Sequence, residues 1–190
     1  MGKKRSKMYN GNHNILLVGE GDFSFSLSLA TRFEELVRKY SKAEENLSVL
    51  ENLGCEILHG INVHTMSKRA CFKRKLFDRI VFNFPHAGFF YREHDNRQIR
   101  LQQDLVRGFL RNAKKMLEND KVHITHKTGC PYDMLGVENI AEEEGPFLKS
   151  QVPFHQDNYP GYVNKREDGA KCNKTFPVGR CSTFKFKKEK

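Results

Sequence analysis

The sequence predicts one α/β domain built on a mostly parallel β-sheet. A chain of 190 residues suits a single domain and can bury a core without disulfides. Apolar strand-like runs alternate with amphipathic helical runs, which is the pattern of a parallel sheet with crossover helices. We therefore expect one domain over residues 1–190, with a basic tail at residues 1–12 and a basic, aromatic loop at residues 155–180.

The order of these runs predicts six strands and at least one long helix. Apolar residues recur at helical spacing over residues 96–117, and Asn119-Asp120 then marks a plausible stop. The last strand alternates polar and apolar residues, so we expect it half exposed, as an antiparallel partner at the edge of the sheet. The expected strands cover residues 14–18, 56–59, 78–83, 121–125, 147–154 and 181–187.

The segment between the first two expected strands has only one apolar periodicity. Residues 22–53 keep one helical face without Gly or Pro until Gly54. A single helix over this segment would run for about 45 Å or more, longer than a small sheet can cover. The sequence thus predicts one continuous helix that must bend, or a sheet that closes a gap.

The charge balance favours a polyanionic partner. Lysine and arginine number 33 against 23 acidic residues, and the net charge of +10 is densest towards both ends of the chain. Such an excess is typical of nucleic-acid binding. Basic tails that only keep a small protein soluble, or that act as a nuclear address, explain the tails equally well.

Cysteine usage and hydropathy indicate the cellular compartment of the chain. The five cysteines are scattered and form no CxxC pair, which favours a reducing compartment. Cys172, Cys181 and His155 fit no common zinc spacing, so we expect no metal. The basic N-terminus has no apolar segment behind it, and no apolar run approaches membrane-spanning length. These features predict a cytosolic or nuclear protein without a membrane partner.

A glycine turn follows the first expected strand. Gly19-Glu20-Gly21 lets the backbone approach a ligand and directs the next helix N-terminus towards it. Phe23 stands where a dinucleotide fingerprint wants a small residue, which argues against a pyrophosphate. A cofactor with a charged amino acid end and no phosphate, such as S-adenosylmethionine, fits better. The alternative is a tight turn that needs glycine only for its geometry.

Polar groups also follow the other expected strands. Ligands of open α/β sheets lie beyond the carboxyl ends of the strands. Asn62, the tetrad Asn83-Phe84-Pro85-His86 and His126-Lys127 would converge there with the glycine turn. Asn62 would accept a hydrogen bond from an adenine amino group, and Asn83 would face an acceptor nitrogen. His126 taken alone is more often a loop histidine than a catalyst.

Several motifs together resemble one family. They are ILLVGEGDFSFSLSLA at residues 15–30, EILHG at 56–60, FDRIVFNFPHAG at 77–88, HITHK at 123–127, NYPGYVNKR at 158–166 and CSTFKF at 181–186. This set resembles the eukaryotic large-subunit (25S-type) ribosomal RNA uridine-N3 methyltransferases. The resemblance implies a Rossmann-like class I methyltransferase sheet, S-adenosylmethionine as cofactor, ribosomal RNA or a pre-ribosome as partner, and a nucleolar or nuclear location, with the cytoplasm as the alternative.

The resemblance also assigns roles to residues. Gly19, Glu20, Gly21 and Asp22 would line the cofactor, and the tetrad would face the uracil. Uridine N3 carries a proton, so a base must remove it as the methyl group arrives. The catalytic candidates are Asn83 to hold the base edge, Pro85 to stiffen the backbone, and His86, with an ordinary pKa of about 6.5, as the base.

RNA contacts are expected from aromatic and basic side chains. Phe84 or Phe89 would stack on the uracil, although both fit equally well as core residues. The loop at residues 155–180 mixes stacking rings with cations, as RNA-binding surfaces do. The alternative is a solvated loop whose rings pin it to the core. The further RNA-binding candidates are Lys127, Tyr159, Tyr162, Lys165 and Arg166.

The chain departs from the family between residues 30 and 55. A Rossmann-like methyltransferase has a second strand there that ends in an acid for the ribose hydroxyls. No such strand is visible, so we expect a sheet without it and a weaker affinity for S-adenosylmethionine. Three functions stay open: a uridine-N3 methyltransferase, a non-catalytic RNA- or ribosome-binding module, and a methyltransferase for amino groups of adenine or protein.

Overall fold

A computed structural model describes residues 8–9, 12–19, 23–33, 43–118, 121–165 and 174–188. The chain contacts divide it into two compact units, which are described separately. The sheet unit comprises Asn14–Gly19, Gly60–Phe154 and Val178–Lys190. The helical unit comprises Met1–His13, Glu20–His59 and His155–Pro177. The expectation of one domain over the whole chain stays a prediction.

The sheet unit holds a five-stranded sheet of order β1-β2-β3-β5-β4. β1 (Ile15–Val18), β2 (Arg79–Asn83) and β3 (Val122–Lys127) run parallel, and β5 (Cys181–Lys188) runs antiparallel to both β3 and β4 (Pro146–Pro153). Five predicted strands are therefore confirmed to within a few residues. The edge position predicted for residues 181–187 is wrong, because β4 pairs along the outer side of β5.

The strand predicted at residues 56–59 does not form. The run lies between Gly54 and Gly60, which both have positive φ, and residues 55–59 have no regular structure. A run of four residues becomes a strand only when it pairs, and the sequence carries no information on whether a partner is present. In the described part of the chain β2 is the only neighbour of β1. The predicted α/β sheet is thus confirmed, and within the described residues it has no second strand beside β1, as expected.

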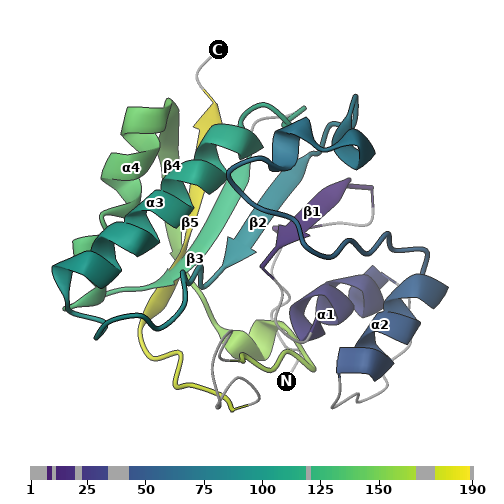
Figure 1. The fold of residues 1–190 in the computed structure, drawn as a ribbon. Coiled ribbons are helices and arrows are strands. Elements are labelled where there is room, and N and C mark those ends of the chain that lie inside the picture. The colour runs from purple at the N-terminus through teal and green to yellow at the C-terminus, as the bar shows by residue number, and fades with distance from the viewer. Residues whose placement is uncertain are drawn as a thin grey trace. The chain divides into compact units, whose positions relative to one another are not determined.

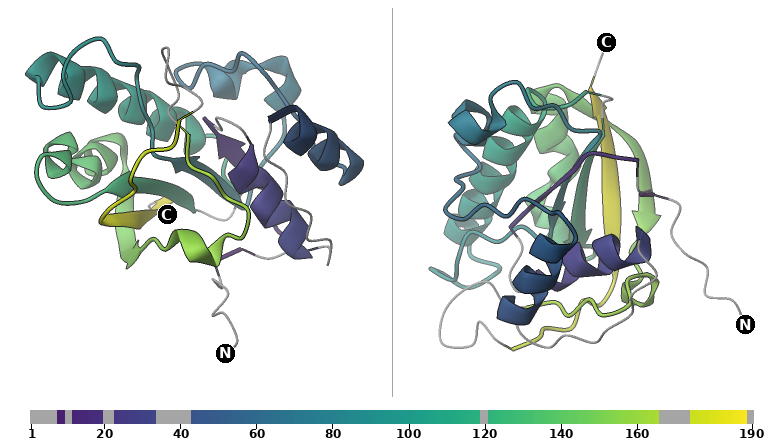
Figure 2. Two further views of the ribbon diagram at one scale, coloured as in Figure 1. Left: turned by 90° about the horizontal axis from the view of Figure 1, so that it is seen from below. Right: turned by 90° about the vertical axis from the view of Figure 1, so that its right-hand side faces the viewer.

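Two helices replace the single helix predicted over residues 22–53. α1 (Ser24–Phe33) and α2 (Ala43–Asn52) pack against each other in the helical unit, as Figure 2 shows. Helices that lie side by side cannot form one straight rod, so the continuous helix is wrong. Residues 34–42 lie outside the described residues. The apolar periodicity continued through both helices because each buries one face, as Leu29 and Leu50 do.

The helices of the sheet unit cover one face of the sheet (Figure 1). α3 (Asn96–Ala113) confirms the long predicted helix but ends four residues earlier, and α4 (Val137–Glu144) packs against α3 and β4. The side chain of Asp95 caps α3 by accepting a hydrogen bond from the Arg97 N–H. Short 3-10 turns occupy Met66–Lys68 (η1), Ala70–Phe72 (η2), Tyr132–Leu135 (η3) and, in the helical unit, Gln156–Asn158 (η4).

An ion pair fastens α4 to α3. The Arg111 guanidinium donates to both carboxylate oxygens of Glu144, at 3.0 and 2.6 Å. These hydrogen bonds are the main reason why the pKa of Glu144 lies below its ordinary value. No helix in the described ranges is both long and apolar enough to cross a membrane.

Candidate active site at the carboxyl ends of the central strands

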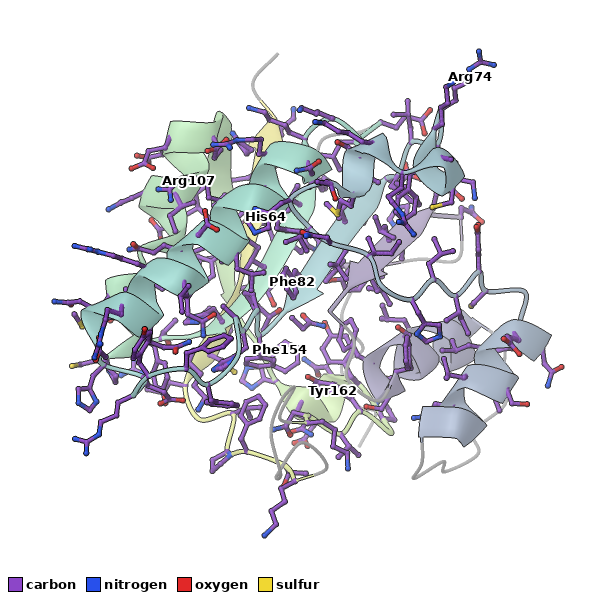
Figure 3. The ribbon with its side chains drawn as sticks, viewed as in Figure 1. His64, Arg74, Phe82, Arg107, Phe154 and Tyr162 are labelled. Carbon is purple, nitrogen blue, oxygen red and sulfur yellow. The ribbon has the colours of Figure 1, made fainter. Side chains whose placement is uncertain are left out.

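The last two residues of β2 face opposite sides of the sheet. Successive strand side chains alternate, and Phe82 lies towards α3, where its ring meets the ring of Phe109 at a centroid distance of 5.1 Å (Figure 3). Asn83 therefore lies on the other side, where its register partner on β3 is Thr125. The hydroxyl of Thr125 bonds that of Thr183 on β5 at 2.9 Å. β2 thus presents a packing residue and a polar residue next to each other.

The side-chain amide of Asn83 lacks hydrogen bonds within the structure described. Asn83 is only 7 % exposed, and neither its Nδ2 nor its Oδ1 has a partner among the described residues. Leaving a buried polar group unsatisfied costs about 1–3 kcal/mol, so folded proteins seldom do it without a reason. At the end of a parallel strand, the amide can serve as one donor and one acceptor for a bound molecule.

Backbone strain follows at the next residue. Phe84 has φ of +48°, a left-handed conformation that a bulky residue rarely adopts. Its N–H donates to the Thr125 carbonyl at 2.7 Å, and its ring meets Phe154 edge to face at 5.7 Å. These contacts hold the strained turn in place. Strain of this kind gathers at functional sites, where it aims the chain towards a ligand.

Pro85 and His86 complete the turn. Pro85 is buried, and the Gly88 N–H donates to Nδ1 of His86 at 3.0 Å. Because a peptide N–H only donates, Nδ1 is the acceptor, and the proton of the neutral ring belongs on Nε2. The ring also lies 4.0 Å from that of Phe89. In this arrangement His86 offers a hydrogen-bond donor rather than a free lone pair at Nδ1.

His126, at the end of β3, has the opposite tautomer. Its Nδ1 lies 2.8 Å from the Lys127 carbonyl and must donate to it, which leaves the lone pair of the neutral ring on Nε2. Burial is the main cause that lowers its pKa, and the charges of Lys127 and His86 add to the effect. The ammonium of Lys127 lies 4.7 Å from the centre of the Tyr132 ring. β3 thus ends in a histidine whose neutral form is favoured by burial and in a lysine that lies over a tyrosine ring.

Packing explains why a glycine, Gly19, follows the carboxyl end of β1. Its φ is +68°, and a Cβ at this position would lie 2.3 Å from Cε2 of Phe82. Both the left-handed backbone and the neighbouring ring therefore require glycine. The other predicted cofactor residues of the turn, Glu20, Gly21 and Asp22, lie outside the described residues.

Asn62 is bonded within its own loop. It is exposed, and its Oδ1 accepts a hydrogen bond from the His64 N–H at 2.9 Å, which closes a local turn. His64 in turn lies against α3, where a Cβ on Gly108 would come within 2.2 Å of its ring (Figure 3). The sequence placed Asn62 at the sheet edge because it expected a strand at residues 56–59, and that strand is absent.

Two tyrosine candidates of the helical unit, Tyr159 and Tyr162, belong to a packed cluster. Tyr159 is buried, and the rings of Tyr159 and Tyr162 lie 4.8 and 5.2 Å from that of Phe25. Ser24 Oγ donates to the Val163 carbonyl, and the Val163 N–H donates back to Ser24 Oγ. These contacts favour the alternative in which the rings of the loop pin it to a core. Lys165 is half-buried, and Arg166 lies outside the described residues.

Two glutamines that the sequence did not indicate bond the loop after the tetrad. The side chain of Gln98 bonds the backbone at Gly88 and Tyr91, and Gln102 accepts from the Ala87 N–H at 2.8 Å. They lie four residues apart on α3, hence on one face of the helix. That spacing was the available signal, but nothing in the sequence indicated that the face meets a loop.

The described residues fit one half of a methyl-transfer site. Asn83 offers one buried donor and one buried acceptor at the carboxyl end of β2. For S-adenosylmethionine, no strand that ends in an acid follows β1 before β2 in the described ranges. No metal site is indicated either, since the described residues contain no group of three or more His, Cys, Asp or Glu side chains suited to an ion.

Comparison with known proteins shows which family the chain resembles. The sequence profile of the BMT5-like family, described as rRNA (uridine-N3-)-methyltransferase BTM5-like, matches residues 16–166. The chain is 25 % identical to the 25S rRNA (uridine(2634)-N(3))-methyltransferase of Saccharomyces cerevisiae, over 83 % of this chain and 67 % of that protein. It is 45 % identical to an uncharacterized Arabidopsis thaliana protein, with 97 % of each covered.

Other relatives are longer or more distant. Heavy metal-associated isoprenylated plant protein 41 of Arabidopsis thaliana is 45 % identical over 95 % of this chain, which spans only 38 % of that relative. Among solved structures, a 30S ribosomal A1408 methyltransferase from an uncultured bacterium superposes with a TM-score of 0.48 at 14 % identity, covering 92 % of this chain and 86 % of that one. The match of the family profile over most of the chain decides the assignment. The chain belongs to the BMT5-like family of rRNA (uridine-N3-)-methyltransferases.

Proposed function

We propose that this chain transfers a methyl group from S-adenosylmethionine to N3 of a uridine in large-subunit ribosomal RNA. The observation that carries the proposal is the Asn83 amide, buried at the end of β2 with both polar atoms lacking partners among the described residues. Membership of the BMT5-like family supports the reaction class, and the name of the yeast relative supports the uridine.

Uridine N3 sets two chemical requirements. The N3–H bond must break as the N3–CH₃ bond forms, and the proton must pass to a base. The methyl group and the proton occupy the same in-plane position on N3, so a group that holds the ring must bind elsewhere. When N3 loses its proton, negative charge spreads over both carbonyl oxygens of uracil.

Asn83 suits the stabilisation of this charge. We propose that its Nδ2–H donates to a uracil carbonyl oxygen and stabilises the charge that develops there. The strained turn at Phe84 would keep the amide fixed, so alignment with the methyl donor costs little at the moment of reaction. S-adenosylmethionine supplies the methyl group when bound, with Gly19 to Asp22 as the proposed cofactor residues.

Two histidines are candidates for the proton acceptor. His86 remains the proposed base, although accepting a proton at Nδ1 requires that the bond from the Gly88 N–H be broken. His126 keeps its lone pair on Nε2 without that cost. If His86 is the base, His86→Ala abolishes transfer and His126→Ala does not. His94→Ala is the matched control, because His94 is exposed on the same loop.

A second candidate function is a non-catalytic RNA- or ribosome-binding module. The observation that favours it is the lack of a second strand beside β1 in the structure described. Titration calorimetry with S-adenosylmethionine addresses it directly. We expect measurable binding that is weaker than that of a full-length relative, whereas no binding at all favours the non-catalytic module.

The experiment that tests the proposal is methyl transfer to unmodified ribosomal RNA, followed by nucleoside analysis. Methylated uridine supports it, and methylated adenine or protein supports transfer to an amino group instead. RNA binding without transfer supports the non-catalytic module. Asn83→Ala should strongly reduce transfer while RNA binding persists.

We also propose that the chain acts on the pre-ribosome in the nucleolus or nucleus. The net charge of +10 supports contact with RNA, and the reaction named for the family occurs on ribosomal RNA. Imaging of the tagged chain checks this location, and a purely cytoplasmic signal would contradict it.

A further inference from the structure

Three consecutive aromatic side chains beside the candidate active site are exposed to solvent. Phe89, Phe90 and Tyr91 are 47, 70 and 40 % exposed. Exposing one large apolar side chain is ordinary, but three in a row form a surface that soluble proteins rarely show without a partner. The run begins three residues after His86, and the ring of Phe89 contacts the His86 ring.

The loop that carries these rings is held by side-chain hydrogen bonds. Gln98 is 2 % exposed, and its amide both accepts from the Tyr91 N–H at 3.0 Å and donates to the Gly88 carbonyl at 2.7 Å. Gln102 accepts from the Ala87 N–H at 2.8 Å. A buried amide with both ends bonded to one loop fixes the course of that loop. The exposure of the rings is therefore built into the fold.

A cation lies over one of the rings. The guanidinium of Arg97 is 4.0 Å from the centre of the Tyr91 ring, and Asp95 holds it in place through hydrogen bonds at 3.1 and 2.8 Å. The neighbouring Arg92 and Arg100 are exposed as well. Rings together with guanidinium planes are the surface on which unpaired RNA bases stack, because every base has a flat π-face.

We propose that Phe90 and Tyr91, backed by Arg97, form a stacking platform for an unpaired nucleotide that flanks the target uridine. The inference rests on the proposed function, since it takes RNA as the substrate. The charged side chains near the rings favour RNA over an apolar protein surface as the partner. Residues 92–100 carry three arginines against two acids, and both acids are already bonded, Glu93 by the Tyr132 hydroxyl and Asp95 by Arg97.

The test measures binding of the full chain to a fluorescent single-stranded RNA of about a dozen nucleotides, and to the same strand in a duplex. We expect the wild type to prefer the single strand. Phe90→Ala and Tyr91→Ala should each weaken single-strand binding about fivefold to 100-fold, the range for loss of one stacked base. Tyr91→Phe keeps the ring and should bind like the wild type.

Leu76→Ala is the matched control. Leu76 is 47 % exposed. It precedes the amino end of β2, whereas the three rings follow the carboxyl end of that strand. It should bind RNA like the wild type. Circular dichroism of all variants should match the wild type, because none of the substituted side chains is buried.

Several results would overturn the platform. Binding of Phe90→Ala and Tyr91→Ala within twofold of Leu76→Ala would do so, as would equal loss on duplex and single strand, or a wild type that binds no RNA. Loss of self-association in Phe90→Ala by sedimentation, with RNA binding intact, would assign the rings to a protein interface instead.

The platform and the proposed function fail in different ways. If the wild type binds single-stranded RNA through Phe90 but methylates nothing, the platform stands and the function falls. If the wild type methylates uridine and Phe90→Ala leaves both KM and kcat unchanged, the function stands and the platform falls. Under both proposals, Phe90→Ala raises KM for RNA more than it lowers kcat.

Discussion

Phe82 and Asn83 are neighbours on β2, yet they meet opposite environments. The ring of Phe82 is buried against Phe109 of α3 and against Gly19. The amide of Asn83 is equally buried, but its two polar atoms have no partners in the described part of the chain. On one face of β2 the Phe82 ring is fully packed, and on the other face the Asn83 amide makes no hydrogen bond to the described residues. The ring of Phe82 stabilises the fold, whereas the amide of Asn83 is left able to bind another molecule.

Part of the central sheet repeats this contrast. Several side chains in step with Phe82 on β2, β3 and β5 are apolar and buried, and several in step with Asn83 are polar and buried. The first set is Ile80, Phe82, Val122, Ile124, Phe184 and Phe186, and the second includes Arg79, Asn83, His123, Thr125 and Thr183. Thr125 and Thr183 bond each other on this face, whereas neither polar atom of the Asn83 amide has a partner among the described residues.

Replacing Phe82 with Ala should give the largest effect on stability. Deleting a buried aromatic ring leaves a cavity, and we expect the free energy of unfolding to fall by about 3–5 kcal/mol. Urea denaturation measures it. Phe90→Ala is the matched control, because that ring is exposed, and it should stay within about 0.5 kcal/mol of the wild type. Equal losses in the two variants would break the comparison.

Asn83→Ala should show the reverse pattern. The amide has no bond to lose among the described residues, so the free energy of unfolding should change by less than about 1 kcal/mol. Methyl transfer should fall about 100-fold to 1000-fold, as when one preorganised donor is removed. Parallel denaturation and transfer assays check both halves. A loss of stability comparable to that of Phe82→Ala would assign Asn83 to the core.

Gly19→Ala sharpens the comparison from the packing side. The new Cβ would meet the Phe82 ring and sit at positive φ, and together these should cost about 1–3 kcal/mol. Gly60→Ala isolates the backbone cost, since Gly60 has φ of +64° with nothing within 4 Å of its Cβ position. Adding Phe82→Ala to Gly19→Ala should relieve the clash, because the ring that the new Cβ meets is gone. Strict additivity of the two losses in this double mutant would therefore contradict the contact.

Glu144→Gln should have the smallest effect and should spare activity. Arg111 lowers the pKa of Glu144 in the folded chain, so the carboxylate stabilises the fold above its unfolded pKa of about 4.3. That stability is lost as the pH falls through the lowered folded value. We expect a loss of about 1 kcal/mol at pH 7 that shrinks in acid, measured by thermal unfolding across pH. Glu142→Gln, at an exposed position, should lack this pH dependence.

The sequence predicted five strands, the long helix α3 and the missing second strand, because each depends on local periodicity or on its absence. It failed where a contact between segments decided. The helix at residues 22–53 is two packed helices, the run at residues 56–59 finds no pairing partner, and residues 181–188 lie inside the sheet. Periodicity shows which face of a segment is apolar, but not which segment covers it.

The candidate site divides in the same way. The motif Asn83-Phe84-Pro85-His86 marked the important turn from the sequence alone, because polar and stiff residues after a buried strand are uncommon. Only the tertiary structure decided that Asn83 lacks partners in the described chain, that Gly88 holds the lone pair of His86, and that Gln98 keeps the aromatic loop exposed. Sequence determines which groups are present and how each strand alternates. The hydrogen bonds left to each group depend on which distant segments approach it, and that is settled only when the whole chain packs.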